Sequence, residues 1–190
     1  RQGREIISLN LGEPDYPTPE NISQAAKKAI DEHFTKYQPV PGILELRQAI
    51  CKKLEQENGI AYCPDEICVS AGAKQAVFNA VFALCGAGDE VIIPTPCWVS
   101  YSEIVKLVGA KPVYVPCIEE KDHELDIDGI RAAITPQTKA IIINTPNNPT
   151  GAVYSGETLR LLGEIAVERS IMIISDEIYE KMVYDGAIHI

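Results

Sequence analysis

The chain has 190 residues, of which 46% are hydrophobic and 23% are charged, and its formal net charge is −10. This length and composition predict a packed core, with one substantial domain or slightly more, rather than a disordered chain. The acidic balance argues against a nucleic-acid or anionic-membrane partner. No apolar run approaches the roughly 20 residues that a bilayer-spanning helix needs. The first residues, RQGREIISLN, lack the pattern of a signal peptide.

The cysteines and histidines show no metal-site spacing. Six cysteines are spread along the chain without a CxxC pair, and the three histidines are isolated from one another, so we predict no metal site. Cys85 and Cys117 fall in or beside apolar runs, where reduced core thiols are common. We therefore expect a cytoplasmic protein without disulfides.

The first part of the chain is predicted to hold an irregular arm and two helices. Residues 1–17 read as irregular, Thr18 is predicted as the N-cap of the first helix, and Pro19 suits its first position. After the turn-rich stretch KYQPVPG, a second helix is predicted over residues 43–58, ended by Gly59.

Strands and helices alternate in the rest of the chain. Strands are predicted at EICVS (66–70), EVIIP (90–94), KPVYVP (111–116), KAIIIN (139–144) and SIMIIS (170–175), and helices at 73–85, 100–109, 126–134 and 155–169. The runs VII, AIII and IMII are apolar throughout, as strands covered on both faces are. The sequence therefore predicts an α/β fold, with a mostly parallel mixed sheet and helices on both faces.

Polar side chains follow two of these strands, at the edge where open α/β sheets bind ligands. NTPNNPTG follows AIII and contains Asn148, and SDEIY follows IMII and contains Asp176 and Tyr179. A buried carboxylate is costly unless it is paired, and a protonated ring nitrogen is one such partner. The set suits a cofactor with a basic ring nitrogen and an ionised ring oxygen. The alternatives are a capping or ion-paired Asp176 and an Asn148 that satisfies its own turn.

Two further segments complete the candidate site. The small residues Gly72 and Ala73 open a helix where backbone N–H groups can approach an anion, and Lys74 adds a charge. An ordinary tight turn is the alternative. Trp98, the only tryptophan, offers a ring on which a planar cofactor can stack, or serves as a core or interface aromatic.

Together these segments resemble the class I/II aminotransferases, the pyridoxal-phosphate enzymes of fold type I, and in particular their aspartate-aminotransferase-like branch. The matching motifs occur in family order: LNLGEPDYPTPE, KYQPVPGILELRQAI, SAGAKQAVFNA, PTPCWVSY, NTPNNPTGAVY and SDEIYEKMVYDG. The resemblance implies pyridoxal 5'-phosphate as cofactor. It also implies that residues 1–40 are an N-terminal arm and first helix, partly in a small domain. Residues 41–190 would be a cofactor-binding large domain that is incomplete at its C-terminus.

The resemblance implies a role for each site residue. In the family, the cofactor phosphate is held by the segment matching Gly72, Ala73 and Lys74, the pyridine ring stacks on the residue matching Trp98, its phenolic oxygen takes donors matching Asn148 and Tyr179, and its nitrogen pairs with the residue matching Asp176. Asp176 and Tyr179 are the implied catalytic residues. Gly12, Trp98 and Asn148 are implied to bind substrate. Tyr37 is implied to reach the phosphate of a neighbouring subunit, so a homodimer is expected, with cis peptides before Pro96 and Pro149.

The expected activity is transfer of an amino group between an L-amino acid, aspartate-like, and a 2-oxo acid in amino-acid biosynthesis. The family's Schiff-base lysine follows the SDEIY segment in a Ser/Lys-rich motif that these residues do not contain, and Lys181 reads as a surface residue. We therefore expect a fragment that is inactive alone. A lyase or decarboxylase with the same cofactor, and an aminotransferase-like sensor domain of a transcription regulator, remain alternatives. A dinucleotide-binding oxidoreductase is disfavoured, because SAGAKQA is not GxGxxG.

Overall fold

The computed structural model of the chain describes Gly12 and residues 16–190, which fall into two units, residues 1–40 and 41–190. The first unit contains helix α1, Glu20–Asp31, which has no buried residue. The prediction of Thr18 as N-cap is wrong, because Pro19 occupies that position in extended conformation (φ −50°, ψ 143°) and no side chain caps the helix. The helix begins one residue later than expected, so Thr18 lies too far from its first free N–H groups.

The second unit begins with helix α2, Leu44–Lys53, which continues as a π-helical segment, Leu54–Asn58. Gly59 ends it with φ +70°, as the sequence predicts. Arg47 fixes α2 to its surroundings: Nη1 donates to the carbonyl oxygen of Pro64 at 2.7 Å, and Nε donates to that of Gly42 at 3.2 Å.

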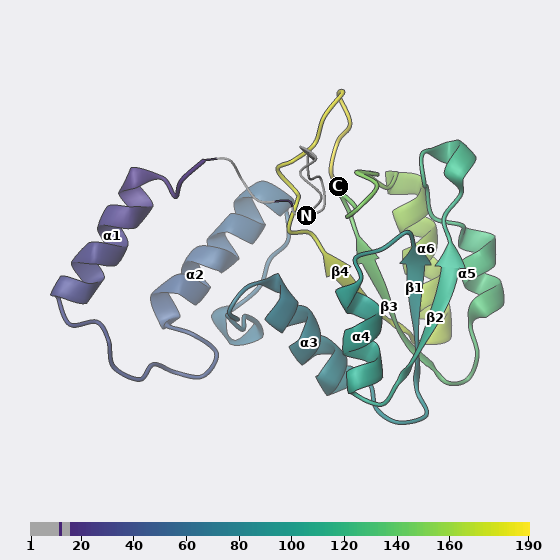
Figure 1. Ribbon diagram of the computed structural model, residues 1–190, viewed down its shortest axis with the longest axis horizontal. Coiled ribbons are helices and arrows are strands. Elements are labelled where there is room, and N and C mark those ends of the chain that lie inside the picture. Colours follow the sequence, from purple (N-terminus) through teal and green to yellow (C-terminus); the bar gives the residue numbers. More distant parts are fainter. Residues whose placement is uncertain (1–11, 13–15) are drawn as a thin grey trace, which may run out of the picture. The chain divides into compact units, whose positions relative to one another are not determined.

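A four-stranded, fully parallel sheet forms the centre of this unit, in the order β2-β1-β3-β4. The strands are β1 (Glu90–Thr95), β2 (Lys111–Pro116), β3 (Thr138–Asn144) and β4 (Met172–Asp176). Helix α3 (Ala73–Leu84) leads into β1, and the helices that connect successive strands are α4 (Ser100–Leu107), α5 (Ile127–Ala133) and α6 (Gly156–Arg169). All four carboxyl ends therefore lie at one edge of the sheet (Figure 1). The predicted α/β fold is confirmed.

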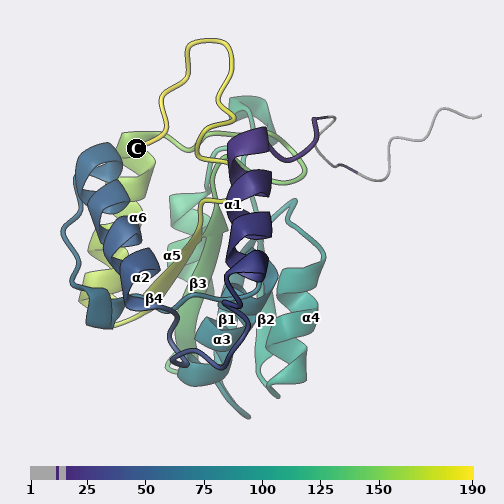
Figure 2. The ribbon, with the colours of Figure 1, turned by 90° about the vertical axis from the view of Figure 1, so that its left-hand side faces the viewer.

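Each strand contributes to two cores, because successive side chains point to opposite faces of a sheet. Val91 and Ile142 pack with residues of α3 and α4, whereas Ile92 and Ile141 pack with residues of α5 and α6. Figure 2 shows α5 and α6 on one side of the sheet and α4 on the other. Burial on both faces explains why the central residues of β1 and β3 are apolar without alternation. Each fully buried aliphatic side chain contributes about 1.5–3 kcal/mol to the free energy of unfolding, relative to leaving it exposed. None of the described helices is both long and apolar enough to cross a membrane.

One predicted strand does not form. Of residues 66–70, Glu66 ends a short 3₁₀ turn, Pro64–Glu66, and the others follow it; none belongs to a strand of the sheet. Ile67 has extended angles (φ −104°, ψ 128°). The N–H of Val69, however, donates to the carbonyl oxygen of Pro41 at 2.9 Å. The segment therefore has strand-like angles but pairs with the loop before α2, and it acts as a connector.

Because this connector packs against Gly42, a side chain at Gly42 should destabilise the fold strongly. The residue has φ +102°, and an added Cβ would lie 2.7 Å from Cγ2 of Val69. Gly42→Ala should lower the free energy of unfolding by about 1–3 kcal/mol, from backbone strain and overlap together. Gly163→Ala in α6 is the matched control, because its Cβ would meet nothing within 4 Å.

Gly163→Ala should instead raise the free energy of unfolding, by up to about 1 kcal/mol, since alanine favours a helix interior. Urea unfolding of both variants measures the difference. Equal effects of the two substitutions would contradict the proposed packing of Gly42 on Val69.

Candidate functional site

Asp176, the last residue of β4, lies at the centre of the candidate site and is only 8% exposed. Its Oδ2 accepts a 2.7 Å hydrogen bond from the hydroxyl of Tyr101, and its Oδ1 accepts from the N–H of Ile178 at 3.3 Å. Among the described residues, no lysine or arginine pairs with this carboxylate. A buried carboxylate with donors but no cation is a suitable partner for a cationic ligand.

Tyr101 on α4 is a site residue that the sequence analysis missed. It is buried, and that burial, followed by its hydrogen bond to Asp176, raises the pKa of its phenol. It therefore stays a neutral donor to the carboxylate. Its ring also meets that of Trp98 edge to face, with centroids 5.3 Å apart. The available signal was spacing: Tyr101 lies three residues after Trp98, about one helical turn, where side chains become neighbours.

Trp98 connects Asp176 to the start of α3. Nζ of Lys74 lies 5.0 Å from the centroid of the Trp98 ring, a cation–π distance. Lys74 stands in the first turn of α3, directly after Gly72, whose φ of +82° and ψ of 165° suit glycine alone. The N–H groups of Ala73, Lys74 and Gln75 have no acceptor among the described residues. Free N–H groups and a lysine at a helix N-terminus form an anion-binding arrangement.

Asn144 connects Asp176 to the loop after β3. Its Nδ2 donates to the carbonyl oxygen of Asp176 at 2.8 Å, and its Oδ1 accepts from the N–H of Asn148 at 2.7 Å. Asn148 and Tyr179 then line one open hollow of about 260 Å³. The other lining residues are Pro146, Asn147, Pro149, Gly151, Met182 and Tyr184.

The predicted cis peptides before Pro96 and Pro149 are confirmed, and the bond before Pro146 is also cis. Two of these three bonds lie in the loop after β3 and the third follows β1. They occur in the two connections that contain Trp98 and Asn148.

The contacts therefore join most of the predicted site residues within residues 41–190. Seven of them lie at or beside the carboxyl edge of the sheet: Gly72, Ala73, Lys74, Trp98, Asn148, Asp176 and Tyr179. Gly12 and Tyr37 belong to the other unit, and both are exposed. The surface reading of Lys181 is confirmed: its side chain is 71% exposed and its Nζ lies 2.6 Å from Oε2 of Glu57.

The fold and the site define a parallel α/β domain whose strand ends bring together one buried carboxylate, one helix start with free N–H groups and one indole ring. The chain matches the family described as aminotransferase class I and II over residues 4–190. The chain belongs to this family.

Relatives and solved structures with aminotransferase names are similar along nearly all of the chain. It is 48% identical over 188 residues to an aspartate aminotransferase of Geobacillus stearothermophilus, covering 99% of this chain and 48% of that protein. It is 47% identical over 187 residues to aromatic-amino-acid aminotransferase 2 of Thermococcus litoralis, covering 97% of this chain and 48% of that protein.

A solved structure of a Thermus thermophilus aspartate aminotransferase mutant superposes with a TM-score of 0.95 at 45% identity, covering 100% of this chain and 50% of that one. The chain thus spans about half the length of the curated relatives that it matches.

The bond between Tyr101 and Asp176 predicts a change in stability and in its pH dependence. Tyr101→Phe should lower the free energy of unfolding at neutral pH by about 1–3 kcal/mol, because a buried carboxylate oxygen loses its donor. Above pH ~10 the unfolded chain loses the Tyr101 proton while the folded chain keeps it. This one group therefore lowers the free energy of unfolding by about 1.4 kcal/mol per pH unit in that range.

Tyr101→Phe should remove this alkaline contribution and make the fall above pH ~10 shallower. Urea unfolding at several pH values measures both effects. Tyr114→Phe, at a half-exposed residue of β2, is the control and should change neither. If the Tyr101→Phe variant keeps the wild-type free energy of unfolding and its wild-type dependence on pH, the Tyr101–Asp176 hydrogen bond contributes nothing to stability.

Proposed function

We propose that residues 41–190 form the cofactor-binding domain of a pyridoxal-phosphate-dependent aminotransferase. The observation that carries the proposal is the buried carboxylate of Asp176, held by Tyr101 and lacking a cation among the described residues. When bound, pyridoxal phosphate supplies a protonated ring that accepts the charge left as the substrate loses its α-proton. Asp176 would hold the proton on the ring nitrogen, and Tyr101 orients that carboxylate.

The remaining donors fit the other groups of the cofactor. The free N–H groups of Ala73 and Lys74, with the open space beside Gly72, suit the phosphate. Trp98 offers a stacking face beside the Tyr101–Asp176 pair. Asn148 and Tyr179 line one hollow, where an amide and a phenol are available to a ring oxygen.

We propose an acidic L-amino acid and a 2-oxo acid as substrates, in amino-acid biosynthesis. Relatives named for aspartate support this choice, and one named for aromatic amino acids widens it. Gly12, with Trp98 and Asn148, is proposed to contact substrate. Tyr37 is proposed to reach the phosphate of a second subunit, which would make the enzyme a homodimer; its full exposure is compatible with that role.

We assign the imine-forming role to no described lysine. Lys74 lies over the Trp98 ring, and Lys181 pairs with Glu57 on the surface. We therefore propose that residues 1–190 alone do not transfer amino groups. The proposed location is the cytoplasm; all six cysteines lie in the described residues as free thiols, which supports a reducing compartment.

Asp176→Asn tests the proposed function in an active protein that carries this chain. The variant keeps the shape of the side chain but loses the charge that holds the ring proton. Turnover of aspartate with 2-oxoglutarate should fall by about 100-fold or more, on the scale of other lost transition-state contacts. Product analysis also separates amino transfer from decarboxylation or lyase chemistry.

Asp128→Asn on α5, an exposed position in the other helical layer, is the control and should keep full activity. Far-UV circular dichroism checks that both variants fold. Near-wild-type turnover of a folded Asp176→Asn variant would mean that the carboxylate is structural.

A further inference from the structure

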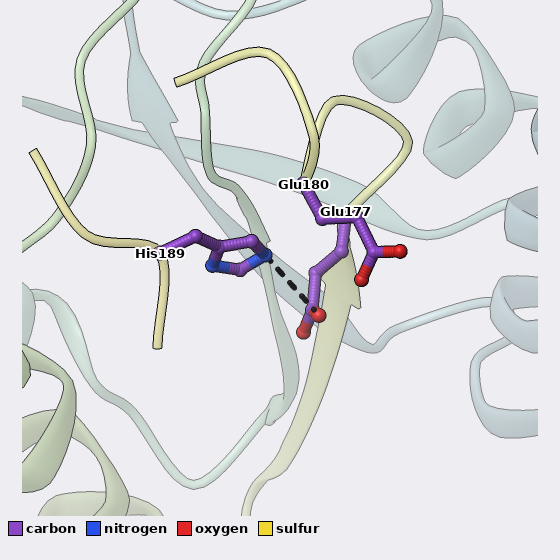
Figure 3. A group of neighbouring side chains, drawn as sticks. All are labelled: Glu177, Glu180 and His189. Atoms are coloured by element: carbon purple, nitrogen blue, oxygen red, sulfur yellow. Dashed lines mark ion pairs between the residues drawn. The ribbon is translucent and has the colours of Figure 1, made fainter. Parts of the chain in front are cut away.

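Outside the proposed cofactor contacts, three side chains from the last part of the chain converge. Glu177, Glu180 and His189 each offer one ligand atom, and these atoms lie within 4.8 Å of one another (Figure 3). The turn after β4 explains the carboxylate pair, because the N–H of Glu180 donates to the carbonyl oxygen of Glu177 at 3.0 Å. His189 comes from the segment that follows.

His189 is the observation that points to a ligand. Its side chain is only 10% exposed, and neither ring nitrogen has a hydrogen-bond partner among the described residues. Nε2 faces Oε2 of Glu177 at 3.5 Å, which is long for a hydrogen bond (Figure 3). A buried imidazole with both nitrogens unpaired is unfavourable unless something binds it.

We propose that Glu177, Glu180 and His189 bind a divalent transition-metal ion, with zinc as the best match. One imidazole nitrogen and two carboxylate oxygens are ligand types that Zn²⁺ accepts, and three protein ligands leave a position for water. A metal here would go against the expectation of no metal site, which considered spacing along the chain alone. It does not depend on the proposed aminotransferase function.

The surrounding charges set the conditions for binding. Glu180 already accepts from Nζ of Lys53 and from Nδ2 of Asn58. Lys53 is therefore a competing cation, which a bound metal must displace or share. Lys181 also acts on Glu180, but its Nζ is paired with Glu57. Counting Glu57 and Lys181 as one neutral pair, the two carboxylates of Glu177 and Glu180 face Lys53 alone, so the cluster keeps a net negative charge for the ion.

A bound ion would stiffen the turn that contains the proposed catalytic groups. Glu177 directly follows Asp176, and Tyr179 lies between the two glutamates. The ion would thus be structural, fixing the segment after β4 against the C-terminal segment that carries His189. Metal addition should raise the melting temperature of the protein, since it binds only the folded state.

Cobalt titration tests the site directly, because Co²⁺ replaces Zn²⁺ and absorbs visible light. The background is the full chain with Cys63→Ser and Cys68→Ser, which removes the two exposed thiols. We expect one equivalent of Co²⁺ to give d–d absorption without a thiolate charge-transfer band, and Zn²⁺ to displace it. His189→Ala and Glu177→Gln should each weaken Co²⁺ binding at least about tenfold. Losing only a hydrogen-bond partner of a metal ligand already lowers metal affinity about 10–100-fold.

Two further variants sharpen the result. His123→Ala changes a half-buried histidine outside the cluster and should leave Co²⁺ affinity unchanged. Lys53→Met removes the competing cation and should tighten binding. Absence of binding by folded protein, or equal affinity in the His189→Ala and His123→Ala variants, would overturn the proposal. In that case His189 would serve only as a partner for Glu177 when protonated.

Discussion

The carboxylate of Asp176 is held where water reaches it poorly, and the geometry around it follows from that. Taking a charge out of water costs several kcal/mol even after relaxation, and here one phenol and one backbone N–H offset part of that cost. The phenol belongs to Tyr101, whose ring supports Trp98, and Trp98 lies under Lys74. The backbone of Asp176 is bound by Asn144, which also holds the N–H of Asn148. Asp176 is thus connected, through its side chain and its backbone, to helices α4 and α3 and to the loop after β3.

The parallel sheet makes this convergence possible. Strands β1, β3 and β4 run in one direction, so the loops that follow them meet at one edge. Two cores, one on each face, fix the strands and leave the loops as the place where polar groups gather. Helix α3 adds its N-terminus beside the same edge through Lys74. Stability therefore comes mainly from the apolar faces, while the edge carries groups whose pairing is incomplete without a ligand.

Much of this could be predicted from the sequence, for physical reasons that also explain the failures. The runs VII and AIII are buried on both faces, so their composition alone predicted strands of a parallel sheet. Most of the run IMII also lies in a strand, but β4 is an edge strand of this sheet and its Met172 is exposed, so the expected cover on both faces is not observed there. The prediction of a strand at residues 66–70 was wrong because a strand needs a neighbouring strand to pair with, and composition does not show whether one is present. Tyr101 and Asn144 were missed because their partner lies far along the chain: Asp176 is 75 residues from Tyr101 and 32 from Asn144. The cluster around His189 was missed for another reason, because residues 177–189 are close in sequence but only the turn after β4 brings the three side chains together. Such pairs appear only when topology brings strand ends together.

We propose that Trp98 and Asp176 belong to one cofactor site, and the fluorescence of Trp98 tests this most directly. Trp98 is the only tryptophan among the 190 residues, so its signal reports on this position. In a longer protein that carries the chain, the fluorescence of a Trp98→Phe variant is subtracted, which removes the signal of any other tryptophan. Addition of pyridoxal 5'-phosphate should quench Trp98 saturably, and pyridoxal without the phosphate should do so only at higher concentration. Binding of pyridoxal phosphate by equilibrium dialysis with no change in Trp98 fluorescence would contradict the account.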